Sequence, residues 1–507
     1  MKRALIFVHR WLGIVLCLVF LIWFPSGIGM MYWTFPAATT ADRLERLPAL
    51  DRSKITRTPA EAYATLKLDD PPGDIRLTSF DGRPAYRFDG RGGPVVYADT
   101  GEEQVEVSRF MVNRAAAAWT GKPVADAQVV TLEGVDQWTV STNLSGLRPV
   151  WKFSWPSGEQ VYVSEATGEV VQHTTTASRI GAYLGPIPHW FYVTALRRHG
   201  PEWSRVVIWS SGIGTFAAIL GLAVAAFMYS PAKRYRYDGA PSAIPYRGQK
   251  RWHMVLGLVF GIATATWAFS GMLSMDPFPG LGSGFSDGPD LDQALRGQAD
   301  MAAFAANHPR DALARLDGIA VKELELTSFA GEPVYMAHLA PGDTRIVPLS
   351  GPPRAEFGRE RIVEVITRAV GDIPIETRLL EQYDRYYLDR TRRQPLPVIL
   401  ATLEDEERTR YYVDPKTARI VGSYGSSDWV QRWAYNGLHS LNFPWLYNYR
   451  PLWDIVVIAF MLGGTALCVT SLVLAWRVLG RRLRAIPGLP RGRTPINDDL
   501  ALADSCS

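Results

Sequence analysis

Two histidines that open long apolar stretches are the first residues able to do chemistry. His9 and His253 lie 244 positions apart, and the residues that follow them align without a gap. At about 100° per residue, a helix places a glycine and a tryptophan on the same face as each histidine. These are Gly13 and Trp23 in the first stretch, and Gly257 and Trp267 in the second. Imidazole binds iron and glycine leaves room for a ring edge, so this face predicts a haem site.

A second interpretation of the same face needs no cofactor. Small residues let helices pack closely, and a histidine at the end of an apolar stretch can anchor it at the membrane surface. For a single histidine this interpretation is the stronger one. The duplication of the whole pattern favours a functional role.

A second pair of histidines, His189 and His439, lies 250 positions apart. Their alignment continues into two further apolar stretches through identical residues, among them Pro201 and Pro451, Trp203 and Trp453, and Gly214 and Gly464. Two repeats related by an axis along the membrane normal would bring His9 to His253 and His189 to His439. We therefore expect one bis-histidine haem near each membrane surface. The alternative is a crossed pairing, in which each haem joins a histidine from one pair to a histidine from the other.

Four apolar segments must position these histidines, and each is long enough for the roughly 20 residues that cross a bilayer. They predict a polytopic α-helical membrane protein whose four transmembrane helices form two pseudo-symmetric repeats. The expected helices are 1–33, 205–230, 251–275 and 454–480; the external domains with their approach segments are 34–204 and 276–453; the cytoplasmic loop and tail are 231–250 and 481–507.

Basic residues predict the orientation of the chain. They cluster before the first apolar segment, between the second and third, and after the fourth. The positive-inside rule places all three clusters, and both termini, in the cytoplasm. The two long polar segments are then expected in the periplasm.

The external segments also repeat. LTSFDGRPAY at 77–86 matches LTSFAGEPVY at 326–335, and YVSEATGEVV at 162–171 matches YVDPKTARIV at 412–421. TPAEAYATL and SRFMVNRAAAAW predict helices, and WTVST, VWKFSW, QVYVSE and EVVQHT predict half-buried strands. Each external domain is thus expected to be a small α+β domain.

Several function classes have no support. The net charge of +4 does not suggest nucleic acid as a partner, and the external segments contain no cysteine for a disulfide, a thiol-redox site or a Cys-ligated metal. A glycine-rich nucleotide loop after a strand and an HExxH motif are both missing from the sequence. Any electron donor must therefore be a separate molecule, either cytoplasmic or in the membrane.

The repeated YVSEATGEVV and YVDPKTARIV units, the HRWLG and RWHMVLG openings, and the IPHWF and GLHSL segments resemble the PepSY-associated transmembrane family. The second PepSY unit departs from the family pattern with ARIV where a glycine is usual. Members similar to this chain include iron-regulated inner-membrane proteins and haem-containing ferric-siderophore reductases. The resemblance implies two haem b groups held by His9, His189, His253 and His439, in a bacterial inner-membrane protein that carries electrons to a periplasmic ferric siderophore or other ferric chelate and releases Fe(II).

The run DRYYLDRTRRQP contains the arginines that are candidates for binding such a chelate. They are Arg385, Arg390, Arg392 and Arg393. Guanidinium groups bind carboxylate and catecholate oxygens, although a solvated charged loop has the same composition.

Two other functions are compatible with the sequence. The external domains could form a binding or regulatory protein for a periplasmic peptidase or ligand, without redox chemistry. A repeat-based transporter is less supported, because the apolar segments contain no buried Asp, Glu or Lys.

Overall fold

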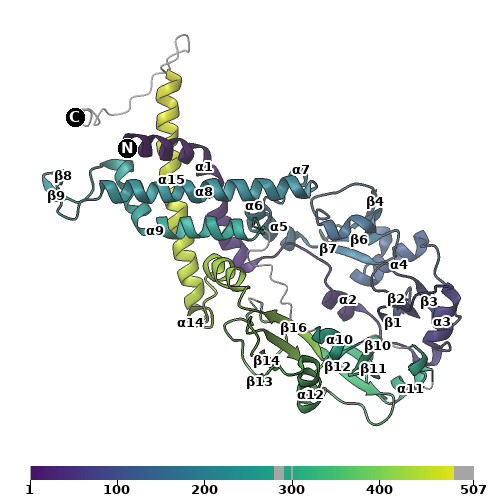
Figure 1. Cartoon of the computed structure of the whole chain (residues 1–507). Helices are drawn as coiled ribbons and strands as arrows, with labels where there is room; N and C mark the ends of the chain where they lie inside the picture. Colours follow the sequence, from purple (N-terminus) through teal and green to yellow (C-terminus); the bar gives the residue numbers. More distant parts are fainter. Residues whose placement is uncertain (1, 279–289, 298–300, 306, 390, 485–507) are drawn as a thin grey trace. The chain divides into compact units, whose positions relative to one another are not determined.

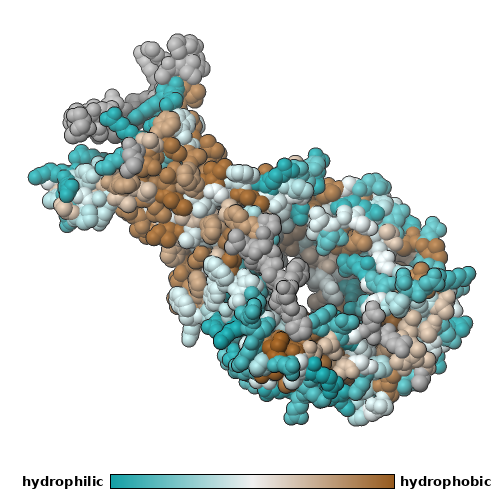
Figure 2. Space-filling model, in the orientation of Figure 1, coloured by the Kyte–Doolittle hydropathy of each residue, from teal (hydrophilic) through white to brown (hydrophobic). Residues whose placement is uncertain are grey.

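The computed structural model describes residues 2–278, 290–297, 301–305, 307–389 and 391–484. Within this part of the chain, four helices are long and apolar enough to cross a membrane, as predicted. They are α1 (Lys2–Tyr32), α8 (Gly200–Met228), α9 (Gly248–Leu273) and α15 (Leu452–Arg484). Apolar side chains cover the face of α8, α9 and α15 that is visible in Figure 2, whose orientation is that of Figure 1. The protein is therefore a multi-pass membrane protein.

The chain divides into two compact units, and the division falls within the four long helices. The first unit contains residues 1–24, 212–265 and 459–507, and the second contains residues 25–211 and 266–458. The first unit consists of helix segments and a short hairpin, β8 (Tyr235–Tyr237) and β9 (Ala240–Ser242). The second unit contains the α+β part and the remaining helix segments.

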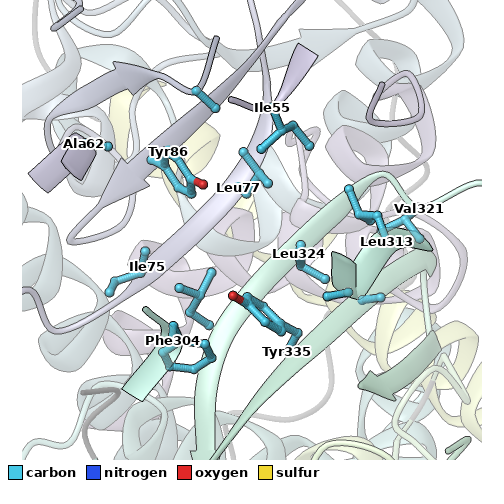
Figure 3. Packing of buried hydrophobic residues seen from close by; sticks show 14 of the residues in the cluster. Ile55, Ala62, Ile75, Leu77, Tyr86, Phe304, Leu313, Val321, Leu324 and Tyr335 are labelled. Atoms are coloured by element: carbon cyan, nitrogen blue, oxygen red, sulfur yellow. The ribbon is translucent and has the colours of Figure 1, made fainter. Parts of the chain in front are cut away.

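Strands from both halves of the sequence form one six-stranded sheet in the second unit, in the order β12-β11-β10-β1-β2-β3. The strands are β1 (Ile75–Phe80), β2 (Arg83–Phe88), β3 (Val95–Tyr97), β10 (Glu323–Phe329), β11 (Glu332–Ala340) and β12 (Asp343–Pro348). Strands β1 and β10 pair antiparallel, with Arg76 opposite Glu325. Figure 3 shows Leu77 of β1 and Leu324 of β10 in one apolar cluster with Tyr86 and Tyr335. The two halves therefore share a hydrophobic core.

Each half also has a four-stranded antiparallel sheet covered by one helix. The first consists of β4 (Gln128–Leu132), β5 (Val150–Ser154), β6 (Gln160–Ser164) and β7 (Val170–Thr174), with α4 (Arg109–Thr120). The second consists of β13 (Ile375–Leu380), β14 (Val398–Leu403), β15 (Arg410–Asp414) and β16 (Arg419–Tyr424), with α12 (Arg359–Val370). Val112 and Ala116 of α4, and Ile362 and Ile366 of α12, are buried against these sheets.

Short helices connect these elements. They are α2 (Thr40–Arg46), α3 (Pro59–Leu66), α5 (Thr176–Leu184), α6 (Pro186–Trp190), α7 (Thr194–Arg197), α10 (Leu291–Leu295), α11 (Pro309–Ala314), α13 (Leu438–Ser440) and α14 (Pro444–Tyr447), with a π-helix, η5 (Val430–Gly437). The helices predicted from TPAEAYATL and SRFMVNRAAAAW are α3 and α4, and their caps are Thr58 and Ser108.

One predicted strand was wrong. Residues 138–142, WTVST, form a turn followed by a 3₁₀-helix, because the Asp136 carboxylate accepts hydrogen bonds from the backbone N–H groups of Trp138 and Thr139. The edge strand of that sheet is instead β4, ten residues earlier. An aspartate side chain that satisfies nearby backbone groups favours a turn over a strand.

Candidate functional site

The first histidine pair lies within the first unit. His9 is on α1 and His253 is on α9, and their ring centroids are 6.3 Å apart with the rings tilted by 34°. The Nδ1 atom of His9 lies 3.1 Å from the carbonyl oxygen of Ala217 on α8. A carbonyl can only accept, so Nδ1 carries the proton and Nε2 keeps its lone pair.

The other member of this pair is oriented by hydroxyls on α15. His253 Nδ1 lies 3.2 Å from Thr470 Oγ1 and 3.3 Å from Ser471 Oγ. Both hydroxyls donate their protons to the carbonyl of Leu467, at 2.7 and 2.9 Å. They must therefore accept from His253, which again leaves Nε2 unprotonated.

The second histidine pair lies within the second unit. His189 is on α6 and His439 is on α13, and their ring centroids are 6.0 Å apart with a tilt of 58°. Both short helices end soon after the histidine at a non-glycine residue with positive φ, Phe191 at 52° and Leu441 at 48°. These two residues are also 250 positions apart, and a non-glycine residue in this region is strained.

Serine hydroxyls contact the imidazoles of this second pair. Ser26 Oγ on α1 lies 3.2 Å from His189 Nδ1, and Ser270 Oγ on α9 lies 3.1 Å from His439 Nδ1. Ser270 donates its own proton to the carbonyl of Trp267 at 3.2 Å, so it accepts from His439. Burial lowers the pKa of His439 to about 4, against the opposing effect of the Trp267 carbonyl. The imidazole of His439 is therefore neutral at physiological pH, as a metal ligand must be.

The separation within each pair suits an ion held by both imidazoles. A bond between a first-row metal and an imidazole nitrogen is about 2.0–2.1 Å long, so two imidazoles on opposite sides of one ion have centroids roughly 6 Å apart. Both observed separations, 6.3 and 6.0 Å, match this spacing. Among the described residues, no group of three or more His, Cys, Asp or Glu side chains could hold a metal ion. Two imidazoles facing one iron suit haem, in which the porphyrin supplies the other four ligands.

Glycines allow close approach to two of the imidazoles. A Cβ atom at Gly221 of α8 would lie 2.7 Å from His9 Cε1, and one at Gly271 of α9 would lie 3.3 Å from His439 Cε1. A Cβ at Gly13 would meet no atom within 4 Å, and one at Gly257 would meet only Leu467 Cδ1, at 3.9 Å. The predicted glycines thus have space beside them, and Gly221 is an additional close contact that sequence reasoning missed.

The two predicted tryptophans lie in different units. Trp23 packs edge-on against Phe20, with their ring centroids 5.8 Å apart. Trp267 is buried, and its carbonyl accepts the hydrogen bond from Ser270. Their proposed contact with haem remains a prediction.

The predicted arginines lie on the loop between β13 and β14. Arg385 is exposed and its guanidinium lies over the ring of Tyr386, 5.6 Å from the centroid. Arg392 and Arg393 are also exposed. The Asp389 carboxylate shapes this loop by accepting backbone hydrogen bonds, including one from Arg393 at 2.5 Å. Arg390 lies outside the described residues.

The serine and threonine partners of the histidines were not predicted from the sequence. Ser26 and Ser270 do occupy equivalent positions, 244 residues apart in the same alignment that relates His9 to His253. This equivalence was the signal in the sequence that could have identified the two serines as functional residues. No local pattern links either serine to a histidine more than 160 residues away.

A family model described as the PepSY-associated TM region matches residues 7–347. These residues include His9, His189 and His253, and they end before His439. Comparison with curated proteins finds no matching relative.

Proposed function

The chain belongs to the PepSY-associated TM family, and on that premise we propose that it is a di-haem b protein that carries electrons across the membrane to a ferric chelate. His9 and His253 would hold one haem, and His189 and His439 the other. The observation that carries the proposal is the close approach of two imidazoles, with centroids 6.3 or 6.0 Å apart, found once in each unit.

The hydrogen bonds of the histidines support iron ligation. Nδ1 faces an oxygen atom in all four imidazoles. Iron ligation uses the nitrogen that this hydrogen bond leaves free, and an acceptor on the other nitrogen orients the ring and raises its basicity. The oxygen partners of His9, His253 and His439 accept, so these three imidazoles share the tautomer with the proton on Nδ1.

Two repeats related by a two-fold axis account for the pairing. Each pair joins positions that the sequence alignment already matches, with offsets of 244 and 250 residues. The contact between β1 and β10 also joins equivalent positions of the two repeats. Arg76 and Glu325 lie opposite each other in the sheet, and they are 249 positions apart, which is the offset between the repeats around them. This agreement favours pairing of like histidines over the crossed alternative.

Bound haem would supply a one-electron couple between Fe(III) and Fe(II), and closed six-coordination favours electron transfer over oxygen chemistry. Burial favours the neutral form of His439, and the oxygen partners of His9, His253 and His439 fix the tautomers of these three imidazoles. The distribution of basic residues favours an inner-membrane protein with cytoplasmic termini and a periplasmic α+β part. The donor would then act from the cytoplasmic side or from the membrane.

The proposed substrate is an anionic ferric chelate such as a ferric siderophore, reduced outside the membrane to release Fe(II). Arg385, Arg392 and Arg393 are exposed and would bind its carboxylate or catecholate oxygens. One electron reduces each Fe(III), so no second redox group is needed in the external part.

The absorption spectrum of the detergent-purified full chain tests this function. We expect the sharp bands of reduced bis-histidine haem b and two haems per chain by the pyridine haemochrome method. Correctly folded but colourless protein would refute the proposal and favour the binding or regulatory alternative.

A further inference from the structure

We propose that Ser26 and Ser270 are positioning residues for the second histidine pair, His189 and His439. They would orient these two imidazoles and set the reduction potential of the haem that the pair would hold. The inference rests on the proposed function and goes beyond it by assigning a role to two residues outside the ligand set. Both serines are almost completely buried, with exposed fractions of 3% and 0%.

His189 and His439 lie on helices that are too short to orient their side chains. The α13 helix has three residues and α6 has five, and both end at a residue with positive φ. The serines, in contrast, lie in the long helices α1 and α9. The hydrogen-bond contacts at 3.2 and 3.1 Å therefore tie each ring to a long helix.

The contact between α9 and His439 is close. Gly271 follows Ser270 directly, and a Cβ atom there would lie 3.3 Å from His439 Cε1. A side chain at this position would push the imidazole away from Ser270. The glycine thus lets the ring reach the serine hydroxyl.

The direction of the hydrogen bond determines its electronic effect. Ser270 donates to the Trp267 carbonyl and accepts the Nδ1 proton of His439. An acceptor on Nδ1–H increases electron donation from the other ring nitrogen, which stabilises ferric over ferrous iron. Ser270 therefore lowers the potential of the haem that His189 and His439 would hold, and its removal raises it. We infer the same role for Ser26 from its equivalent position in the repeat, 244 residues earlier.

Potentiometric titration of the full chain in detergent, followed optically, tests this role. We expect Ser26→Ala and Ser270→Ala to keep two haems per chain and to raise the potential of one haem component. At a fixed applied potential, the reduced-to-oxidised ratio of that component should rise about three- to tenfold, and tenfold corresponds to about 59 mV for a one-electron couple. The potential of the other component, the haem that His9 and His253 would hold, should not change.

Conservative variants separate hydrogen bonding from packing. Ser270→Cys keeps the size of the side chain but has a weak sulfur acceptor, so its potential should move towards that of Ser270→Ala. Ser270→Thr keeps the hydroxyl and should retain the wild-type potential. Ser210→Ala is the matched control, because Ser210 hydrogen-bonds to the Val206 and Val207 carbonyls in its own helix.

The outcomes are distinguishable. An unchanged potential in Ser270→Ala, or a shift as large in Ser210→Ala, would overturn the inference while leaving the haem proposal intact. If Ser270→Ala loses haem, recovery of haem and potential in Ser270→Thr supports the role, and loss in Ser270→Thr as well overturns it. A wild-type protein without haem would instead refute the proposed function.

Discussion

Arg76 on β1 lies directly opposite Glu325 on β10, at the centre of the sheet shared by the two halves of the chain. The two residues are also 249 positions apart, which is the offset between the repeats around them. Their guanidinium and carboxylate groups are 4.0 Å apart at Nη2 and Oε2, and Arg76 also contacts Glu323 at 3.0 Å. If the two repeats had the same charged residue at this position, like charges would lie opposite each other. This chain instead has an arginine in one repeat and a glutamate in the other.

Acid should destabilise this region through Glu325. Burial alone would raise its pKa, but the hydrogen bond with His338 and the charges of Arg419 and Arg76 lower the pKa to about 2 from the ordinary 4.5. A lowered carboxyl pKa contributes stability that is present above pH 4.5 and lost as the pH falls towards 2, roughly 3 kcal/mol in all. Thermal unfolding of the purified chain followed by tryptophan fluorescence from pH 7 to pH 2 should show this loss.

The variant Glu325→Gln should remove most of that pH dependence and be less stable at pH 7, because three basic side chains lose their shared carboxylate. Glu332→Gln is the control, since Glu332 pairs with Arg361 at the surface. Equal acid sensitivity in wild type and Glu325→Gln would contradict the assignment.

His253→Ala should lose about half of the bound haem, because it removes one ligand of the first pair only. His439→Ala should lose the other half, and the double variant should be colourless. Haem content by the pyridine haemochrome method measures each loss. His199→Ala, which changes an exposed histidine, should retain both haems; full haem content in His253→Ala would exclude that ligand.

Gly221→Ala should weaken the first site selectively. Its Cβ atom would lie 2.7 Å from His9 Cε1, so the imidazole must move out of its hydrogen bond with the Ala217 carbonyl. We expect loss of about half of the haem in the purified protein, with the second site intact. Gly480→Ala, whose Cβ meets no atom within 4 Å, should have no effect; wild-type haem content in both variants would disprove the proposed fit.

Neutralising two arginines should weaken use of an anionic ferric chelate. The double variant Arg392→Gln/Arg393→Gln should raise KM about tenfold without changing haem content, since hydrogen bonds to charged groups are the stronger ones. The increase should shrink at high ionic strength. Arg368→Gln is the control, because Arg368 is exposed on α12 and paired with Glu364. Unchanged KM at low salt would remove these arginines from the substrate site.

The orientation of the chain can be tested with its own cysteines. Cys17 and Cys468 are buried within the long helices, and Cys506 lies in the C-terminal tail. In intact spheroplasts, a membrane-impermeant maleimide should label an introduced Ala125→Cys but not Cys506. Labelling of Cys506 before the membrane is broken would reverse the predicted topology.

The sequence was sufficient to predict the four long helices, because apolar length is a local signal that needs no knowledge of neighbours. A constant offset between repeats also predicted which histidines would meet, and the structure brings His9 to His253 and His189 to His439. Their role as haem ligands remains to be tested by the variants above.

The shared sheet and the serine partners could not be predicted in the same way. The β1 and β10 strands pair across about 250 residues, and each strand taken alone has the same alternation whether its neighbour is local or distant. A serine such as Ser270 contributes one hydroxyl with no periodic pattern, so its partner His439 becomes apparent only when the backbone is in place.

The sheet shared by the two halves also constrains how the protein is made. Until residues 323–329 have been synthesised, the β1 strand has no partner on one edge. An unpaired edge strand is a site for mispairing, and pairing over such a long loop is slow. Strand β1 therefore has one uncovered edge while α8 and α9 are synthesised, and mispairing is most favourable during this period.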